Sequence, residues 1–155
     1  MHRVSLHRLT MPILRIGMGV FLAYWGVDKL VALEGSVGIF SSFYGLDVGA
    51  IVVQVAGVAE IGLGALLAVG LFRIPMAWIQ LVVNGVSTLA SWRQILDPWA
   101  VLGIRDGGNA HLFLASIVIT AASVVLVLNA PDDALTLDRR FGRSPGAGPG
   151  APPPA

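Results

Sequence analysis

The sequence predicts an all-α membrane protein, an antiparallel bundle of four transmembrane helices with a short interfacial segment between the first two. Two observations predict this fold class. Apolar residues make up 55 % of the 155 residues and charged residues 12 %, whereas soluble domains usually carry about 25 % charged residues. The mean hydropathy is +0.79. Because so few polar side chains cannot cover a water-facing globule of this size, the composition excludes an ordinary soluble enzyme.

The charged and metal-binding residues narrow the possible partners further. The net charge is +1 and the basic residues form no long stripe, so we expect no nucleic-acid partner. The chain has no cysteine, which excludes a disulfide framework, a thiolate metal site and thiol chemistry of its own. The three histidines are too scattered to predict a zinc site. No metal, haem or flavin motif is evident.

Four apolar stretches are long enough to cross a bilayer, which takes about 20 helical residues for a hydrocarbon layer of about 30 Å. They cover residues 12–31, 48–72, 75–92 and 110–130, of which the third is the shortest and most polar. Every backbone group must be hydrogen-bonded within such a segment, which favours helices. The very short link before Pro75 predicts a helical hairpin.

The remaining segments are assigned by their polarity. Residues 33–47 are too polar and glycine-rich to span, and they predict a short helix or loop on the membrane surface. Residues 1–11 predict a cytoplasmic N-terminal segment, and 12–130 the transmembrane domain. Residues 131–155 predict a cytoplasmic tail, disordered from about residue 144 because proline, glycine and alanine alone cannot form a core.

The distribution of lysine and arginine predicts the orientation. With four spans, both termini and the second loop lie on one side of the membrane. That side holds seven basic residues: Arg3, Arg8, Arg15, Arg73, Arg139, Arg140 and Arg143. The other side holds three: Lys29, Arg93 and Arg105. The positive-inside rule therefore places both termini in the cytoplasm.

Polar residues inside the predicted spans indicate a candidate site. An ionisable group at bilayer depth costs several kcal/mol and usually has a partner or a task. Glu60 lies at the midpoint of the second span, on a helical face of small residues that allows another helix to approach. The third span carries a polar stripe at helical spacing, which must turn inward or line a cavity. Its members are Gln80, Asn84, Ser87 and Ser91.

We therefore predict a polar pocket with Glu60 as the catalytic residue. The residues predicted to bind a cofactor are Lys29, Gln54, Asn84 and His111. Structural alternatives stay open. Arg15 and Lys29 could extend to the headgroups, and Glu60 could form a purely structural hydrogen bond with Asn84 or Gln80. His111 could be a surface or capping residue.

Several short motifs also occur in a distinctive order. They are Arg15-x-Gly17, Trp25-Gly26-Val27-Asp28-Lys29, the central Glu60 with following glycines, the Arg73 turn, Asp106-Gly107-Gly108-Asn109 and Leu135-Thr136-Leu137-Asp138. In this order, over about residues 10–140, the sequence resembles the DoxX family of four-helix bacterial membrane proteins. The resemblance implies a multi-pass protein of the bacterial inner membrane and, loosely, redox work, with Gly26, Lys29, Glu60 and Arg15 as the residues that carry over.

Two functions follow as hypotheses. The first is a redox-associated, quinone-linked membrane subunit, in which Lys29, Asn84 or His111 binds a quinone carbonyl and Glu60 relays a proton. At most it would be a subunit of an oxidoreductase, because electrons would come from a partner protein. The second is a non-catalytic accessory or scaffold subunit of a larger membrane complex. Expected partners are the lipid bilayer and either a membrane or redox protein or further copies of the chain.

Overall fold

The computed structural model describes residues 3–133 and 135–142, with side chains from residue 8 onward. All regular structure in these residues is helical. The long helices are α1 (Arg3–Val31), α3 (Ala50–Val69), α4 (Arg73–Ala90) and α6 (Ala115–Asn129). The short ones are α2 (Leu33–Tyr44), α5 (Trp92–Leu96), η1 (His111–Leu114), η2 (Ala130–Asp132) and α7 (Leu137–Arg140). The predicted disorder from residue 144 lies outside the described residues.

The all-helical, membrane-spanning class is confirmed. Three helical stretches of the described chain are long and apolar enough to cross a bilayer: Arg8–Val31, Ala50–Val69 and His111–Arg140. They correspond to the first, second and fourth predicted spans. The third corresponds to α4, which is not among them because its buried polar residues lower its hydropathy. α1 begins at Arg3 rather than at residue 12, since helical hydrogen bonding can continue beyond the apolar segment.

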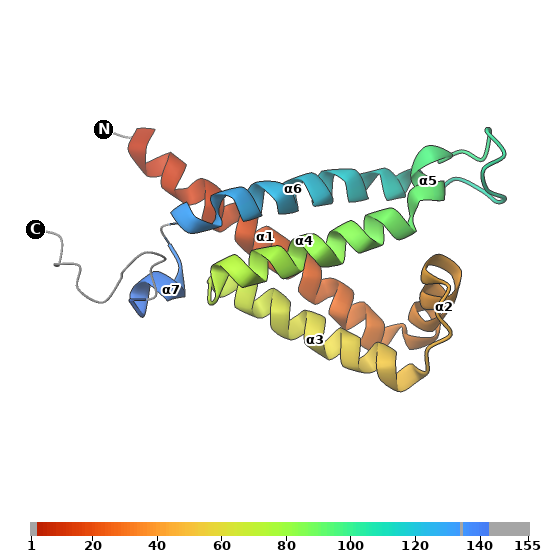
Figure 1. Ribbon diagram of the computed structural model, residues 1–155, viewed down its shortest axis with the longest axis horizontal. Coiled ribbons are helices and arrows are strands. Elements are labelled where there is room, and N and C mark those ends of the chain that lie inside the picture. The colour runs from red at the N-terminus through yellow and green to blue at the C-terminus, as the bar shows by residue number, and fades with distance from the viewer. Residues whose placement is uncertain (1–2, 134, 143–155) are drawn as a thin grey trace, which may run out of the picture.

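The long helices associate as two pairs. α1 packs mainly on α3, and α4 mainly on α6. Figure 1 shows α3 and α4 close together at the turn that joins them and farther apart toward the end that carries α2. At that end Phe43 of α2 stacks on Phe113 with ring centroids 5.5 Å apart, and the Tyr44 hydroxyl lies 3.0 Å from Ser87 Oγ. The predicted surface segment is thus a helix that contacts both α4 and η1.

Two reciprocal glycine pairs bring α1 and α3 into backbone contact. A Cβ atom on Gly19 would lie 2.5 Å from Gly64 O, and one on Gly26 would lie 2.5 Å from Gly57 O. Both distances are too short for any side chain. The pairs are seven residues apart on each helix, so both fall on one seam. The hydrophobic effect does not drive helix association in lipid. Close van der Waals packing between small residues at such a seam holds the helices together instead.

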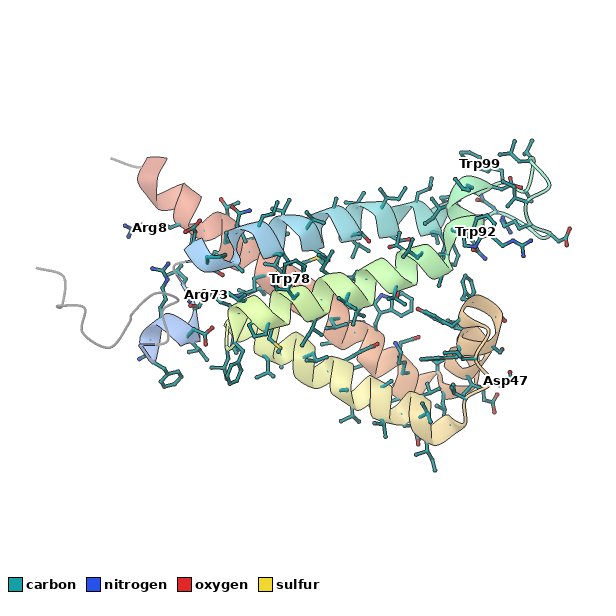
Figure 2. All side chains as sticks on the ribbon, in the orientation of Figure 1. Arg8, Asp47, Arg73, Trp78, Trp92 and Trp99 are labelled. Atoms are coloured by element: carbon teal, nitrogen blue, oxygen red, sulfur yellow. The ribbon has the colours of Figure 1, made fainter. Side chains whose placement is uncertain are left out.

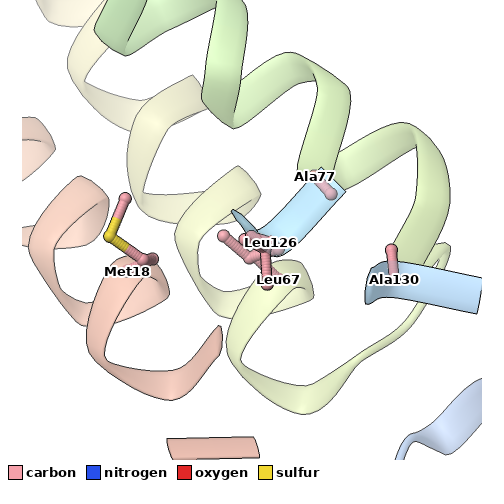
Figure 3. Packing of buried hydrophobic residues seen from close by; sticks show 5 residues of the cluster. All are labelled: Met18, Leu67, Ala77, Leu126 and Ala130. Atoms are coloured by element: carbon pink, nitrogen blue, oxygen red, sulfur yellow. The ribbon is translucent and has the colours of Figure 1, made fainter. Parts of the chain in front are cut away.

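The apolar core is small and joins both pairs. It consists of Met18, Leu67, Ala77, Leu126 and Ala130, each less than 9 % exposed. These residues come from α1, α3, α4, α6 and η2, and Figure 3 shows them. Outside it, large apolar side chains point outward, such as Ile51 at 74 % and Leu128 at 71 % exposure. In water such a surface would aggregate, whereas in a bilayer it faces acyl chains.

The polar stripe of α4 turns inward and connects helices. Gln80 donates from Nε2 to Met18 O of α1 at 3.4 Å, and Asn84 donates from Nδ2 to Ser123 Oγ of α6 at 3.0 Å. Gln80 is 0 % and Asn84 7 % exposed. The polar residues of α4 therefore serve as interhelical hydrogen-bond partners.

At the α3–α4 turn, Arg15 is buried in an ion pair with Asp133. Its guanidinium also donates to Leu135 O at 2.8 Å and to Ala68 O at 3.3 Å. Arg15 is 3 % exposed, so it does not extend to the headgroups. Gly70 has a φ of +71° and a Cβ there would lie 2.6 Å from the Arg15 guanidinium, so both its conformation and its space require glycine.

The segment after α6 folds back onto the same turn. Asp138 accepts hydrogen bonds from the backbone N–H of Phe72 at 2.9 Å and of Arg73 at 2.8 Å, and so caps the N-terminus of α4. The Arg73 side chain donates to Ala130 O at 2.8 Å and to Thr136 Oγ1 at 3.1 Å. These bonds join the start of α4 and the segment after α6 into one buried polar cluster.

Candidate functional site in the α1–α3 helix pair

Lys29 and Glu60 form an ion pair between α1 and α3. Lys29 Nζ lies 2.7 Å from Glu60 Oε2, and the two side chains retain 13 % and 16 % exposure. Glu60 stands near the middle of α3, whereas Lys29 stands near the end of α1. The lysine therefore reaches toward the middle of the membrane-spanning segment, and it does not extend outward to the headgroups.

The direction of the lysine follows from helix geometry. Side chains of an α-helix tilt toward its N-terminus, so Lys29 points back along α1. One turn earlier lies Trp25, whose ring centroid is 5.7 Å from the ammonium and whose carbonyl oxygen is 3.5 Å from Nζ. A cation over an indole face is favourable by about 0.5–2 kcal/mol. Trp25 thus holds the ammonium from one side while Glu60 holds it from the other.

The glycine seam sets the distance at which this pair can form. Gly26 faces Gly57, and a Cβ on Gly57 would lie 3.0 Å from Lys29 Cβ. Continuing this antiparallel register places Lys29 level with Gln54. Glu60 is six residues farther along α3, about 9 Å by the helical rise. The two side chains bridge this offset because their backbones are in contact.

The other predicted site residues lie elsewhere. Gln54 is exposed on α3, and Asn84 is engaged with Ser123 between α4 and α6. His111 is exposed, and its Nδ1 lies 2.6 Å from Asn109 Oδ1. The structure therefore brings Lys29 and Glu60 together, and it pairs Glu60 with Lys29 where the sequence suggested Asn84 or Gln80.

An open surface hollow of about 370 Å³ lies on the outer face of α1, next to Trp25. Its lining residues are Phe21, Tyr24, Trp25 and Asp28, all on α1. Trp25 belongs to both the hollow and the ion-pair site. Three aromatic rings beside a lysine–carboxylate pair can hold a flat apolar ring that carries polar substituents.

Sequence reasoning missed two features. It did not assign Trp25 a contact with Lys29, although an i, i+4 spacing places both on one helical face. It also did not anticipate the buried cluster around Arg15 and Arg73. The sequence held one signal of an ordered segment after α6, because threonine is a residue type that favours the N-cap of a helix. In the structure the Thr136 hydroxyl accepts a hydrogen bond from Arg139 N at the start of α7.

No group of three or more histidine, cysteine, aspartate or glutamate side chains that could hold a metal ion occurs in the part of the chain that the structure describes. No curated protein and no solved structure matches this chain. The family model of DoxX matches residues 10–92, more than half of the sequence and including both Lys29 and Glu60. With its apolar helices, the protein is an integral membrane protein that contacts lipid, and by this match the chain belongs to the DoxX family.

Proposed function

We propose that this protein is a redox-associated membrane subunit linked to quinone, and that the Lys29–Glu60 pair is its quinone-binding and proton-handling site. The observation that carries the proposal is an ion pair in the middle of two membrane-spanning helices whose side chains remain 13 % and 16 % exposed. Ionisable groups at this depth are costly and usually functional. A purely structural pair would gain from complete burial, whereas this one stays accessible to a small ligand.

The two charged groups have complementary roles. Lys29 has three N–H donors, and its bonds to Glu60 Oε2 and Trp25 O occupy two of them. The third is available to a carbonyl oxygen of a ligand. Glu60 can accept or release a proton next to that oxygen, and Lys29 stabilises its negative charge while the proton is absent. The pair can therefore bind a carbonyl and exchange a proton at one place.

The chemistry of the surroundings fits a quinone. The aromatic hollow shares Trp25 with the pair, so an apolar ring would lie against indole and phenyl groups with a carbonyl toward Lys29. A bound quinone would supply two-electron, two-proton carrier chemistry, with electrons from a partner redox protein. Gln54, level with Lys29 in the helix register, is the nearest further candidate for a ligand contact. Asn84 already bonds Ser123 of α6, and His111 already bonds Asn109 of its own segment.

We also propose that α4 spans the membrane as the third of four spans, and that both termini lie in the cytoplasm of a bacterium. Two observations support this topology. The exposed side chains of α4 are apolar, with Val82 at 59 % and Leu89 at 74 % exposure, while its polar face is bonded inward. Figure 2 places Arg8 and Arg73 at one end of the molecule and Asp47 and Trp99 at the other.

Replacing each glutamate in turn tests the site. The chain has two glutamates, Glu60 in the pair and Glu34 exposed on α2, so E34Q is a matched control for E60Q. The purified protein, with its other three tryptophans replaced by phenylalanine, is titrated with decylubiquinone in lipid nanodiscs, and quenching of the Trp25 fluorescence reports binding next to it. E60Q removes the ion pair that holds the Lys29 ammonium in place for the quinone carbonyl, so we expect binding to weaken about tenfold, whereas E34Q should bind as the parent does. Equal affinity in all three proteins would refute the proposal.

A second candidate function is a non-catalytic accessory or scaffold subunit. The observation that favours it is that Lys29 and Glu60 neutralise each other across the glycine seam, which would also suit a pair that merely holds α1 on α3. The double variant K29E/E60K separates the two functions. A scaffold retains both thermal stability and partner capture in mild detergent after the swap. A quinone site regains stability but not quinone affinity, because the cation and the carboxylate have exchanged helices.

A further inference from the structure

The loop between α5 and η1 exposes apolar side chains. Trp99 is 63 %, Val101 79 % and Leu102 69 % exposed. Figure 1 shows this loop at one end of the molecule, beyond the α4–α6 pair, and Figure 2 shows Trp99 beside it. A solvent loop of this length normally exposes polar residues, since its backbone is hydrated by water.

The first part of the same loop folds around Asp97, which is 1 % exposed. Asp97 Oδ1 accepts hydrogen bonds from the N–H of Val101 at 2.8 Å and of Leu102 at 3.2 Å. Its Oδ2 accepts from Ile104 N–H at 3.1 Å. One carboxylate thus satisfies three backbone donors that no helix or sheet would pair.

Arg105 satisfies the carbonyl oxygens in the same way. Its Nε donates to Asp97 O at 2.8 Å, and its Nη2 donates to Pro98 O at 3.1 Å and also to Gly108 O. The N–H of Ala110 closes the loop on Pro98 O at 2.7 Å. Several backbone donors and acceptors between residues 97 and 110 are thus bonded within the loop.

This inside-out arrangement is what a water-poor environment requires. Unpaired N–H and C=O groups cost several kcal/mol in lipid, whereas exposed apolar side chains gain there. We propose that residues 97–105 form an interfacial anchor that inserts Trp99, Val101 and Leu102 into the boundary between headgroups and acyl chains. The anchor does not depend on the Lys29–Glu60 site.

The surroundings of the loop favour lipid over a protein partner. The apolar surface continues onto the flanking helices, where Leu96 is 57 % and Leu112 78 % exposed, and the latter begins a membrane-spanning segment. Trp92, half exposed, carries the Arg93 guanidinium 5.7 Å from its ring. Tryptophan with a neighbouring cation is typical of the headgroup level.

Single-cysteine labelling can measure the depth directly, because the chain contains no cysteine. V101C carries a nitroxide, and the full-length protein is reconstituted in vesicles of phosphatidylethanolamine and phosphatidylglycerol. D47C is the matched control, since Asp47 is exposed in the α2–α3 loop at the same end of the molecule. Collision with oxygen, which concentrates in lipid, is compared with collision with a water-soluble nickel chelate.

We expect V101C to collide more with oxygen than with nickel and D47C to do the reverse. Equal nickel accessibility at both positions would overturn the proposal, because the loop would then lie in water. A loop that docks on a separate protein would give this same result, since the vesicles contain no partner. Protection of V101C from both reagents would also overturn the proposal, because another copy of the chain would then cover the loop.

Adding D97N to V101C tests whether the carboxylate builds the anchor. The amide that replaces the carboxylate would present an NH₂ group to one set of backbone N–H donors, so the loop opens and nickel accessibility at position 101 rises. Circular dichroism of the same sample checks that the helices remain folded. If D97N leaves the oxygen-to-nickel ratio of V101C unchanged, the Asp97 carboxylate does not build the anchor, and the proposal is wrong on this point.

Discussion

Among the side chains that the structure describes, α1 makes two ion pairs, and they differ in how completely they are enclosed. Arg15 and Asp133 have side-chain exposures of 4 % and 2 %, whereas Lys29 and Glu60 have 13 % and 16 %. Arg15 further donates to two backbone carbonyls of other segments, while Lys29 donates to one carbonyl of its own helix. Both pairs lie on one helix of a membrane protein. They differ in the exposure of their side chains and in the hydrogen bonds that each cation donates, and these two properties distinguish a structural pair from an accessible one.

The largest effect is expected from breaking the enclosed pair. R15A leaves Asp133 buried without its cation and removes the bonds to Ala68 and Leu135, so the free energy of unfolding should fall by about 3–5 kcal/mol. Unfolding by sodium dodecyl sulfate in mixed micelles measures it. R8A, at an exposed arginine on the same helix, is the control. If R15A lowered the free energy of unfolding less than K29M, which breaks the Lys29–Glu60 pair, the contrast between the two pairs would be wrong.

The seam beneath the accessible pair comes next. G57A places a methyl group 2.7 Å from Gly26 O, so the helices must separate, at a cost of about 1–3 kcal/mol. G62A is the matched control on the same helix, because nothing lies within 4 Å of its Cβ position. Thermal unfolding in detergent compares them. If G57A and G62A unfold at the same temperature, the seam does not set the spacing of α1 and α3.

Breaking the accessible pair should cost less. K29M retains most of the length of the side chain but removes the ammonium, and because the pair is partly exposed we expect a loss of about 1 kcal/mol. Quinone affinity in nanodiscs should fall more clearly than stability. If the free energy of unfolding falls as far as in R15A while quinone affinity stays at the parent value, the pair is structural.

A third carboxylate, Asp97, extends the comparison. Backbone N–H groups donate to it, whereas Asp133 and Glu60 are paired with cations. Desolvation raises the pKa of Asp97, but hydrogen bonds from Leu102, Val101 and Ile104, with the charge of Arg105, together hold it below the ordinary value of 3.8. A lowered folded-state pKa contributes stability above pH 3.8 that is lost as the pH falls through the folded-state value. The loop should therefore stay closed from neutral pH to about pH 4 and open below it.

The emission of Trp99 in a variant without the other tryptophans measures this transition, which should be the smallest of the four effects. Adding D97N should remove the transition, because the group that titrates is absent. An opening midpoint above pH 3.8 would mean that the folded loop raises the pKa of Asp97, which contradicts the hydrogen bonding described above.

Much of the fold could be predicted because membrane solvation acts on individual segments. Apolar length alone located α3, the C-terminal end of α1 and the start of the segment at His111 within a few residues. The polar stripe of α4 predicted an inward face, since a polar face cannot contact lipid. The ends of helices were less predictable. Residues in the α3–α4 turn are held by Asp138, which is more than sixty residues away in the sequence.

The site was predicted in part. The position of Glu60 in the middle of an apolar segment marked it as exceptional, and Lys29 was found on the face that also carries Gly26. Their direct pairing could not be predicted, because it depends on the seven-residue register of two glycine pairs. Asn84 and His111 lay at suitable depths by sequence, but depth does not tell which side of a helix pair a residue occupies.

The sequence by itself determined that the chain is a helical membrane protein with a carboxylate at bilayer depth, because transfer of each segment into lipid depends on its own composition. The tertiary structure decided which cation neutralises that carboxylate, why Arg15 is enclosed rather than extended to the surface, and how the loop around Asp97 bonds its own backbone. These outcomes depend on close approach of segments distant in sequence, and a hydrogen bond or ion pair forms only where backbone packing brings the two groups within about 3 Å.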